Sequence, residues 1–216
     1  GDRHVIRASI GPVWDGNEVW LITGAGALFA AFPMVYATTF SGFYLAIMLV
    51  LFGLIVRAVS LEFRHHDSDW RALWAATFFL GSRVPALLVG VALGNVVRGV
   101  PMDQQGNYIG TFWELLNPYS LLVGATGLLL IVQHGAAWIA LKSEGAFHRR
   151  ALRYRRATFW TFAALALATS VATVIAVPRA SDNVFGRPET KAVAADMAPG
   201  HARGGPTWAA AAPLPV

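Results

Sequence analysis

Two carboxylates stand at the mouth of the first long apolar stretch of this 216-residue chain. Asp15 and Glu18 lie within Trp-Asp-Gly-Asn-Glu-Val-Trp, residues 14–20. One interpretation is a capping box, with Asp15 as the N-cap and Glu18 three residues on, and both would favour the positive end of the helix dipole. The other is proton handling by an acid that Trp14 and Trp20 screen from water. The residues alone leave both interpretations open.

Two further polar side chains interrupt apolar stretches. Arg83 lies in Phe-Phe-Leu-Gly-Ser-Arg-Val-Pro, where a buried cation is costly and suggests a function or a partner. That partner would be on another subunit, a lipid phosphate or missing sequence, and the alternative is snorkelling or a shifted segment boundary. His134 could ligate haem, but hydrogen bonding within a helix bundle is the favoured interpretation.

The composition favours a membrane protein. Hydrophobic residues make up 56% of the chain and charged residues 13%, whereas a soluble domain has about 25% charged residues. The excess of basic residues, which gives a net charge of +5, is expected to lie in cytoplasmic loops and does not indicate nucleic-acid binding. The chain has no cysteine, which excludes disulfides, thiolate metal sites and cysteine nucleophiles.

Five apolar segments predict an all-α polytopic membrane protein, a bundle of about five transmembrane helices with a disordered C-terminal tail. Residues 1–16 are expected to be a cytoplasmic loop, 17–177 the transmembrane domain, and 178–216 a polar tail rich in Pro and Ala. The expected membrane segments are 17–36, 41–57, 73–97, 118–141 and 157–177. Gly24, Gly26, Gly90 and Gly94 are expected to permit close helix packing.

Basic residues alternate between the loops. The piece before the first segment and the loops after the second and fourth are rich in arginine, whereas the other loops contain only Arg98. If all five segments cross, the three basic regions share one side, and the positive-inside rule makes that side cytoplasmic. Pattern alone leaves three classes open: a redox-complex subunit, a transporter or a structural membrane scaffold.

One family matches these motifs. The stretch from Ile10 to Tyr44 closely resembles subunit II of the cytochrome bd-type ubiquinol oxidases. The resemblance continues through Arg-Ala-Val-Ser-Leu-Glu-Phe-Arg, Gly-Ser-Arg-Val-Pro, Leu-Leu-Asn-Pro-Tyr-Ser and Gln-His-Gly. It covers Arg3 to about Arg156 and fades in the fifth segment.

The resemblance implies a multi-pass protein of the bacterial plasma membrane, in a complex that oxidises quinol and reduces oxygen to water in the respiratory chain. Haem b and haem d would belong to subunit I, the partner in a heterodimer. This chain would bind no cofactor through its own side chains and would stabilise that partner, with membrane lipids around both. The alternative is a membrane transporter or a non-catalytic scaffold subunit.

Residue roles follow from the same resemblance. Asp15 matches the acid of a cytoplasmic proton path, while Trp14, Asn17, Glu18 and Trp20 have supporting roles. A second set, expected to form ion pairs in a structural loop, comprises Arg57, Glu62 and Arg64. The family pattern also has an extra helix before the matched region and several after it, so we expect a fragment, or a chain truncated or frame-shifted near Pro178.

Overall fold

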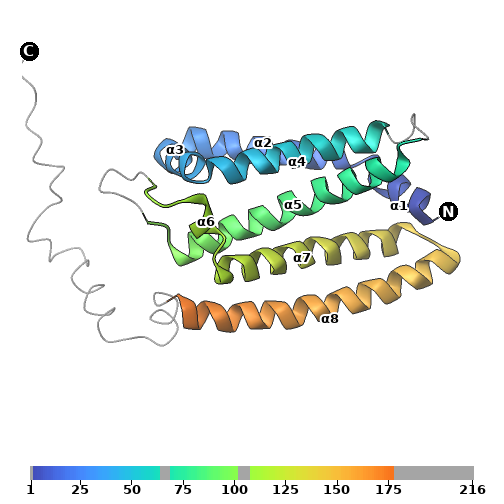
Figure 1. The fold of residues 1–216 in the computed structure, drawn as a ribbon. Helices are drawn as coiled ribbons and strands as arrows, with labels where there is room; N and C mark the ends of the chain where they lie inside the picture. Colours follow the sequence, from blue (N-terminus) through green and yellow to red (C-terminus); the bar gives the residue numbers. More distant parts are fainter. Residues whose placement is uncertain (1, 64–68, 102–107, 178–216) are drawn as a thin grey trace, which may run out of the picture. The chain divides into compact units, whose positions relative to one another are not determined.

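The fold is that of an all-α protein. The structure is a computed structural model that describes residues 2–63, 69–101 and 108–177, and within these ranges it contains helices and no strand (Figure 1). The predicted fold class is therefore confirmed. The helices are α1 (Asp2–Ile10), α2 (Trp14–Ala31), α3 (Pro33–Gly42), α4 (Tyr44–Phe63), α5 (Arg71–Arg98), α6 (Phe112–Leu115), α7 (Pro118–Lys142) and α8 (Gly145–Ala176).

Four of the described helices, α4, α5, α7 and α8, are long and apolar enough to cross a membrane. They correspond to four of the five expected segments, with bounds that differ by a few residues in α4. The largest difference in bounds is in α8, which begins at Gly145 and not near 157. Its first three turns are rich in Ala, Arg and Leu, which favour helix, so the helix begins before the apolar stretch does.

The first expected segment, 17–36, is divided between two helices. The break falls at Phe32, which has φ −138° and ψ 63°, and Pro33 follows as the first residue of α3. Proline lacks a backbone N–H and disfavours the helical conformation of the residue before it. Uninterrupted hydrophobicity concealed this break, because hydropathy does not register the geometry of a single proline.

The N-terminal residues differ from the expected loop. They form α1, and the chain turns once before α2 begins, with the Val13 N–H donating to the Ile10 carbonyl at 3.0 Å. The Trp138 ring N–H of α7 donates to the Ser9 carbonyl at 3.0 Å. The entry of α2 is therefore attached to the long helices through α1.

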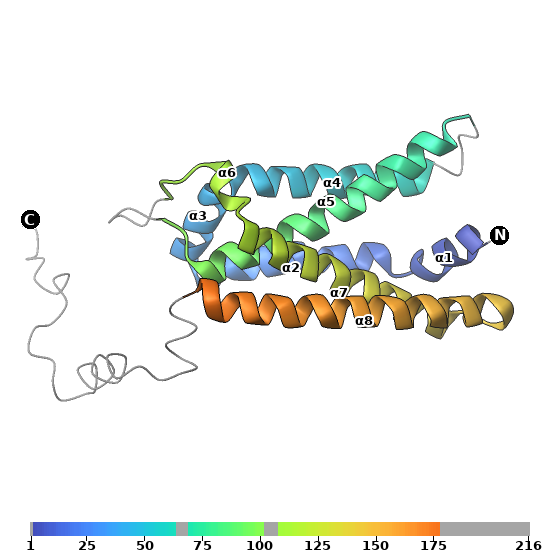
Figure 2. The same cartoon turned by 60° about the horizontal axis from the view of Figure 1, so that its bottom comes forward.

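The long helices pack around α5. Figures 1 and 2 show α5 between α4 and α7. A Cβ at Gly90 would lie 2.7 Å from the Gly124 Cα, and one at Gly94 would lie 2.8 Å from the Ser120 Cα. The predicted packing role of Gly90 and Gly94 is thus confirmed. Gly24 and Gly26 differ, because a Cβ there would meet nothing within 4 Å in the described chain.

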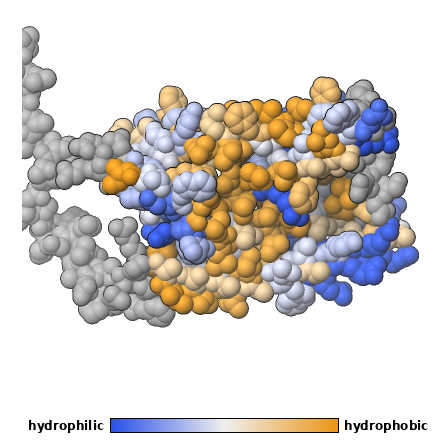
Figure 3. Space-filling model, in the orientation of Figure 1, coloured by the Kyte–Doolittle hydropathy of each residue, from blue (hydrophilic) through white to orange (hydrophobic). Residues whose placement is uncertain are grey.

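Charge gathers at one end of these helices. The ends of α4 and α7 and the starts of α5 and α8 lie together with α1 (Figure 1), and Figure 3 shows an apolar band with hydrophilic residues concentrated at that end. We call this the basic end. Its described basic residues include Arg71, Lys142, Arg149, Arg150, Arg153, Arg155 and Arg156.

The described chain ends at Val177, directly after α8. The predicted tail, 178–216, lies outside the described residues.

Candidate functional site at the entry of α2

The acidic motif forms the first two turns of α2, at the basic end (Figure 1). Val13 occupies the N-cap position, and no side chain makes a capping hydrogen bond there. The capping-box interpretation is therefore wrong, because the helix begins two residues earlier than an N-cap at Asp15 would require. Asp15 lies inside the first turn and is exposed. Its carboxylate remains near the positive end of the helix dipole.

Glu18 forms an ion pair with Arg57, between Oε1 of the first and Nη2 of the second. Both side chains are largely covered, with exposed fractions of 21% for Glu18 and 27% for Arg57. The pair joins α2 to α4, and each charge offsets part of the cost of removing the other from water. Glu18 thus bridges two helices and does not cap one.

The structure differs from the structural loop that was expected to contain Arg57, Glu62 and Arg64. Arg57 and Glu62 belong to α4, with Glu62 exposed near its end. Arg64 lies outside the described residues. The helix continues past residue 57, where the apolar segment was expected to end, because Ala58 to Phe63 contain no Gly or Pro to stop it.

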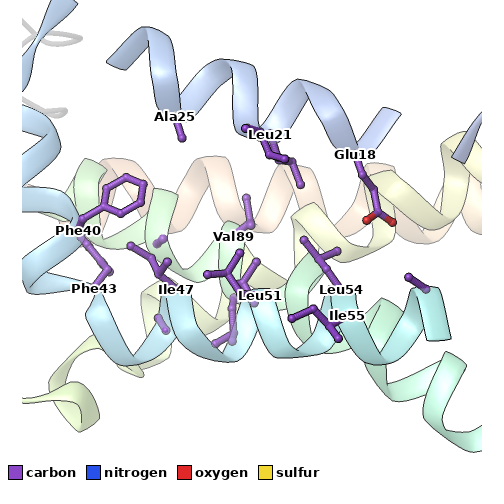
Figure 4. A pocket seen from close by; sticks show the side chains of 16 residues that line it. Glu18, Leu21, Ala25, Phe40, Phe43, Ile47, Leu51, Leu54, Ile55 and Val89 are labelled. Carbon is purple, nitrogen blue, oxygen red and sulfur yellow. The ribbon is translucent and has the colours of Figure 1, made fainter. Parts of the chain in front are cut away.

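A groove of about 490 Å³ extends from Glu18 between α2 and α4. Figure 4 shows the Glu18 carboxylate on the side of α2 that faces α4, at one end of the groove. The other lining residues are apolar, and they include Leu21, Ile47, Leu51 and Val89. A low-polarity surface beside the ion pair strengthens its electrostatic attraction.

The two motif tryptophans do not enclose Asp15. Trp20 is 73% exposed, and five residues of helix place it roughly 140° around the axis from Asp15. Trp14 is half-buried, and Asn17 is exposed. The predicted screening by Trp20 is therefore wrong within this chain, whereas an exposed Trp near a helix end is typical of an interface anchor.

A second polar cluster, at the opposite end, was not identified from the sequence. Asn95 of α5 is buried, and its side-chain amide donates to the Leu115 carbonyl at 2.7 Å. Asn117 donates to the Asn95 side-chain oxygen at 2.9 Å and caps α7 by accepting from the Ser120 N–H at 2.9 Å. Two sequence features could have indicated this cluster: an Asn inside an apolar segment, and an Asn-Pro pair at a helix start. The network fixes α5, α6 and α7 together.

The two isolated polar residues lie on outer surfaces. Arg83 is exposed on α5, and its guanidinium lies 3.9 Å from the centre of the Phe79 ring, beside a hollow of about 430 Å³ between α5 and α7. His134 is exposed on α7 and does not lie inside the bundle. Among the described residues no three His, Asp or Glu form a group suited to a metal ion.

Comparison with known proteins identifies one family. The model of cytochrome bd terminal oxidase subunit II matches residues 1–215, well beyond the stretch in which the resemblance was visible. Cytochrome bd-I ubiquinol oxidase subunit 2 of Escherichia coli K12 is 45% identical over 155 residues, which cover 69% of this chain and 41% of that protein.

Two other relatives give the same result. A probable cytochrome oxidase subunit 2 of Haemophilus influenzae is 46% identical over 156 residues, 69% of this chain and 41% of that protein. Cytochrome bd ubiquinol oxidase subunit 2 of Bacillus subtilis is 43% identical over 152 residues, 69% of this chain and 45% of that protein. The match thus spans less than half the length of these curated relatives.

Proposed function

This chain belongs to the cytochrome bd terminal oxidase subunit II family, and from that premise we propose that it serves a quinol:oxygen oxidoreductase of the respiratory chain. In this proposal it stabilises a haem-bearing subunit I in a heterodimer and admits protons from the cytoplasm at Asp15. The observation that carries the proposal is Asp15 of the acidic motif, which is exposed at the basic end of a multi-pass bacterial membrane protein.

Sidedness supports a cytoplasmic entrance for protons. Positively charged loops are retained in the cytoplasm, and the basic end contains most of the described Arg and Lys residues. Asp15 is exposed at that end, so water can reach its carboxylate. A proton taken up there would lie at the edge of the apolar band and one helical turn from Glu18.

The two acids of the motif have distinct proposed tasks. Asp15 binds and releases a proton at its carboxylate. The Glu18–Arg57 pair holds α2 against α4 and so fixes the position of Asp15. The partner's haems would supply the electron transfer and oxygen chemistry, and quinol would be oxidised in that subunit.

The surface of α2 supports a stabilising role. None of its side chains is fully buried within the described part of the chain, and Trp20, Ile22 and Phe29 are among its exposed large apolar residues. An apolar helix with so little packing inside its own chain is suited to packing against another membrane subunit. Subunit I is the partner that we propose for this surface.

The test is Asp15→Asn in the assembled complex, with quinol-dependent oxygen consumption and the reduced-minus-oxidised haem spectrum as readouts. Asn has nearly the size of Asp, but its amide cannot take up and release a proton. We expect oxygen consumption to fall roughly 10-fold or more, as for the loss of a proton-transfer group, while the haem spectrum is unchanged. Glu144→Gln, an exposed acid at the same end, is the matched control and should keep full activity.

Unchanged oxygen consumption in a complex with normal haem content would contradict the proton role. The alternative, a transporter or a scaffold without a redox partner, is tested by purifying the chain with its membrane partners. A haem spectrum that disappears when the partner is removed supports the oxidase. Substrate flux without any haem in the purified assembly supports the alternative.

A further inference from the structure

The start of α8 is the most concentrated patch of positive charge in the described chain. Five arginines occupy the eight positions from 149 to 156, and all five are exposed. The helix has 32 residues, about 48 Å at a rise of about 1.5 Å, whereas a membrane core is about 30 Å thick. The arginine-rich turns therefore extend past the hydrocarbon core into the headgroup layer.

Three of these arginines fall on one line along the helix. At about 100° per residue, Arg149, Arg153 and Arg156 lie within roughly 60° of one another around the axis. The line continues through Trp160, Leu167 and Val171, which are 67%, 68% and 52% exposed. We call these six residues the α8 stripe. It passes from cations to an aromatic ring and then to aliphatic side chains.

The α8 stripe faces away from the neighbouring helix. Thr158 donates to the Gln133 side-chain oxygen of α7 at 2.5 Å, and the Thr169 and Thr126 hydroxyls lie 2.6 Å apart. Both threonines of α8 are roughly 180° around the axis from the stripe. The face that joins α7 and the face that bears the arginines are thus opposite sides of one helix.

The arginines of the stripe lack compensating charge within the described chain. No acid occurs from Gly145 to Ala176, and neither Arg153 nor Arg156 forms an ion pair with a described residue. Like charges three or four residues apart on a helix repel each other. A bound anion would remove this repulsion, so the stripe is electrostatically suited to a negatively charged ligand.

We propose that the α8 stripe binds an anionic phospholipid of the leaflet at the basic end. The arginines hold the phosphate and Trp160 lies at the level of the headgroup, where aromatic side chains gather. One acyl chain lies along Leu167 and Val171. The rise from Trp160 to Val171 is about 16 Å, close to the thickness of one hydrocarbon leaflet. The order of side chains thus follows the order of chemical groups in the lipid.

The test compares phosphatidylglycerol with phosphatidylcholine. The 216-residue chain in detergent is titrated with each lipid carrying bromine on its acyl chains, which quenches nearby tryptophan. The signal of Trp160 is obtained as the difference from Trp160→Phe. We expect Trp160 to be quenched at lower concentrations of phosphatidylglycerol than of phosphatidylcholine. Equal quenching by the two lipids would overturn the proposal.

Matched variants locate the site. Arg153→Gln with Arg156→Gln should reduce the preference for phosphatidylglycerol roughly 25-fold, at about fivefold for each arginine near an anionic surface. Arg71→Gln with Arg155→Gln removes the same charge from exposed positions at the same end but outside the stripe, and should keep most of the preference. Arg153→Lys with Arg156→Lys keeps the charge and should restore binding. An equal loss in both glutamine pairs would show a diffuse field and no site.

A protein partner is the competing occupant of this face. The same quenching experiment is therefore repeated on the chain purified in complex with its membrane partners. Preserved preference for phosphatidylglycerol supports the lipid site. Loss of all quenching at Trp160 in the complex would show that a partner helix covers the stripe, and would overturn the proposal. Neither result depends on whether Asp15 conducts protons.

Discussion

Glu18 and Arg57 show how a single contact changes the meaning of a motif. The sequence alone singled out the carboxylates at the start of this helix, because Asp and Glu near a hydrophobic segment are rare. It did not indicate the partner of Glu18, because Arg57 belongs to another helix and the family resemblance suggested that it lies in a structural loop. The pairing depends on how α2 and α4 pack, which no local pattern encodes. The residue that suggested capping is therefore an interhelical tie.

A double-mutant cycle measures the interaction free energy between Glu18 and Arg57. Glu18→Gln or Arg57→Gln leaves the other charge unpaired beside an apolar groove. Because both side chains are partly exposed, each change should lower the free energy of unfolding by about 1–2 kcal/mol, between the surface and buried cases. The double variant should lose less than the sum, since no unpaired charge remains. Unfolding in mixed micelles followed by circular dichroism gives these values, with Glu144→Gln as the near-neutral control.

If the loss of unfolding free energy in the double variant equals the sum of the two single losses, the ion pair is contradicted.

Tyr108 provides a prediction about pH outside the membrane segments. Burial raises the pKa of its phenol above the ordinary value of 10.0, and the nearby carboxylate of Glu114 raises it further. The folded state therefore retains the phenolic proton at pH values where the unfolded chain has lost it. The stability from this proton is fully present below about pH 10 and is lost as the pH rises through the pKa of the folded state.

The pKa of Tyr108 can be read from the ultraviolet absorbance of the phenolate, with Tyr108→Phe subtracted. Glu114→Gln removes the smaller of the two causes, so the pKa should move part of the way back toward 10. A titration curve that is identical with and without the Glu114 carboxylate would contradict the electrostatic contribution.

At the scale of elements, α5 is the helix on which the packing depends. It presents glycines to both neighbours, since a Cβ at Gly90 would meet the α7 backbone and one at Gly81 would lie 2.6 Å from the Gly53 carbonyl oxygen of α4. Small residues on opposite faces permit close approach on each side. The sequence predicted close packing at Gly90 and Gly94, but it gave no means of separating them from Gly24 and Gly26.

Gly90→Ala tests that packing. The added methyl group would have to displace the Gly124 backbone, which cannot rotate away, so the free energy of unfolding should fall by about 1–3 kcal/mol. Gly135→Ala in α7 is the matched control, because nothing lies within 4 Å of the new methyl group. That change should stabilise the helix by up to about 1 kcal/mol. The same unfolding assay applies, and equal effects of the two substitutions would contradict the close contact.

Hydropathy predicted the long helices but not the end of α2, the start of α8 or the contact between Asn95 and Asn117. Long apolar segments predicted α4, α5, α7 and α8, because a membrane helix must satisfy its backbone internally over about 20 residues. The end of α2 depends on Pro33, and the start of α8 on a charged segment that is nonetheless a good helix former. The Asn95–Asn117 network joins residues from separate segments, so it follows from the fold and not from either segment.

For the whole molecule, the central prediction is its orientation in the membrane. The chain passes back and forth so that α1, the ends of α4 and α7 and the starts of α5 and α8 meet at the basic end (Figure 1). Proton entry at Asp15 from the cytoplasm requires that this end be cytoplasmic. The charge distribution supports that orientation, since Arg98 of α5 is the described Arg or Lys nearest the opposite end.

The absence of native cysteine makes orientation directly measurable. Glu144→Cys places an exposed thiol at the basic end, and Thr111→Cys places one at the opposite end, just before α6. With a membrane-impermeant maleimide on intact cells, Thr111→Cys should react and Glu144→Cys should react only after the membrane is permeabilised. The permeabilised sample is the internal control, because both thiols must then be labelled. The reverse pattern would place Asp15 on the outer face, where it could not take protons from the cytoplasm, and the entry proposal would fail even if Asp15→Asn lowered activity.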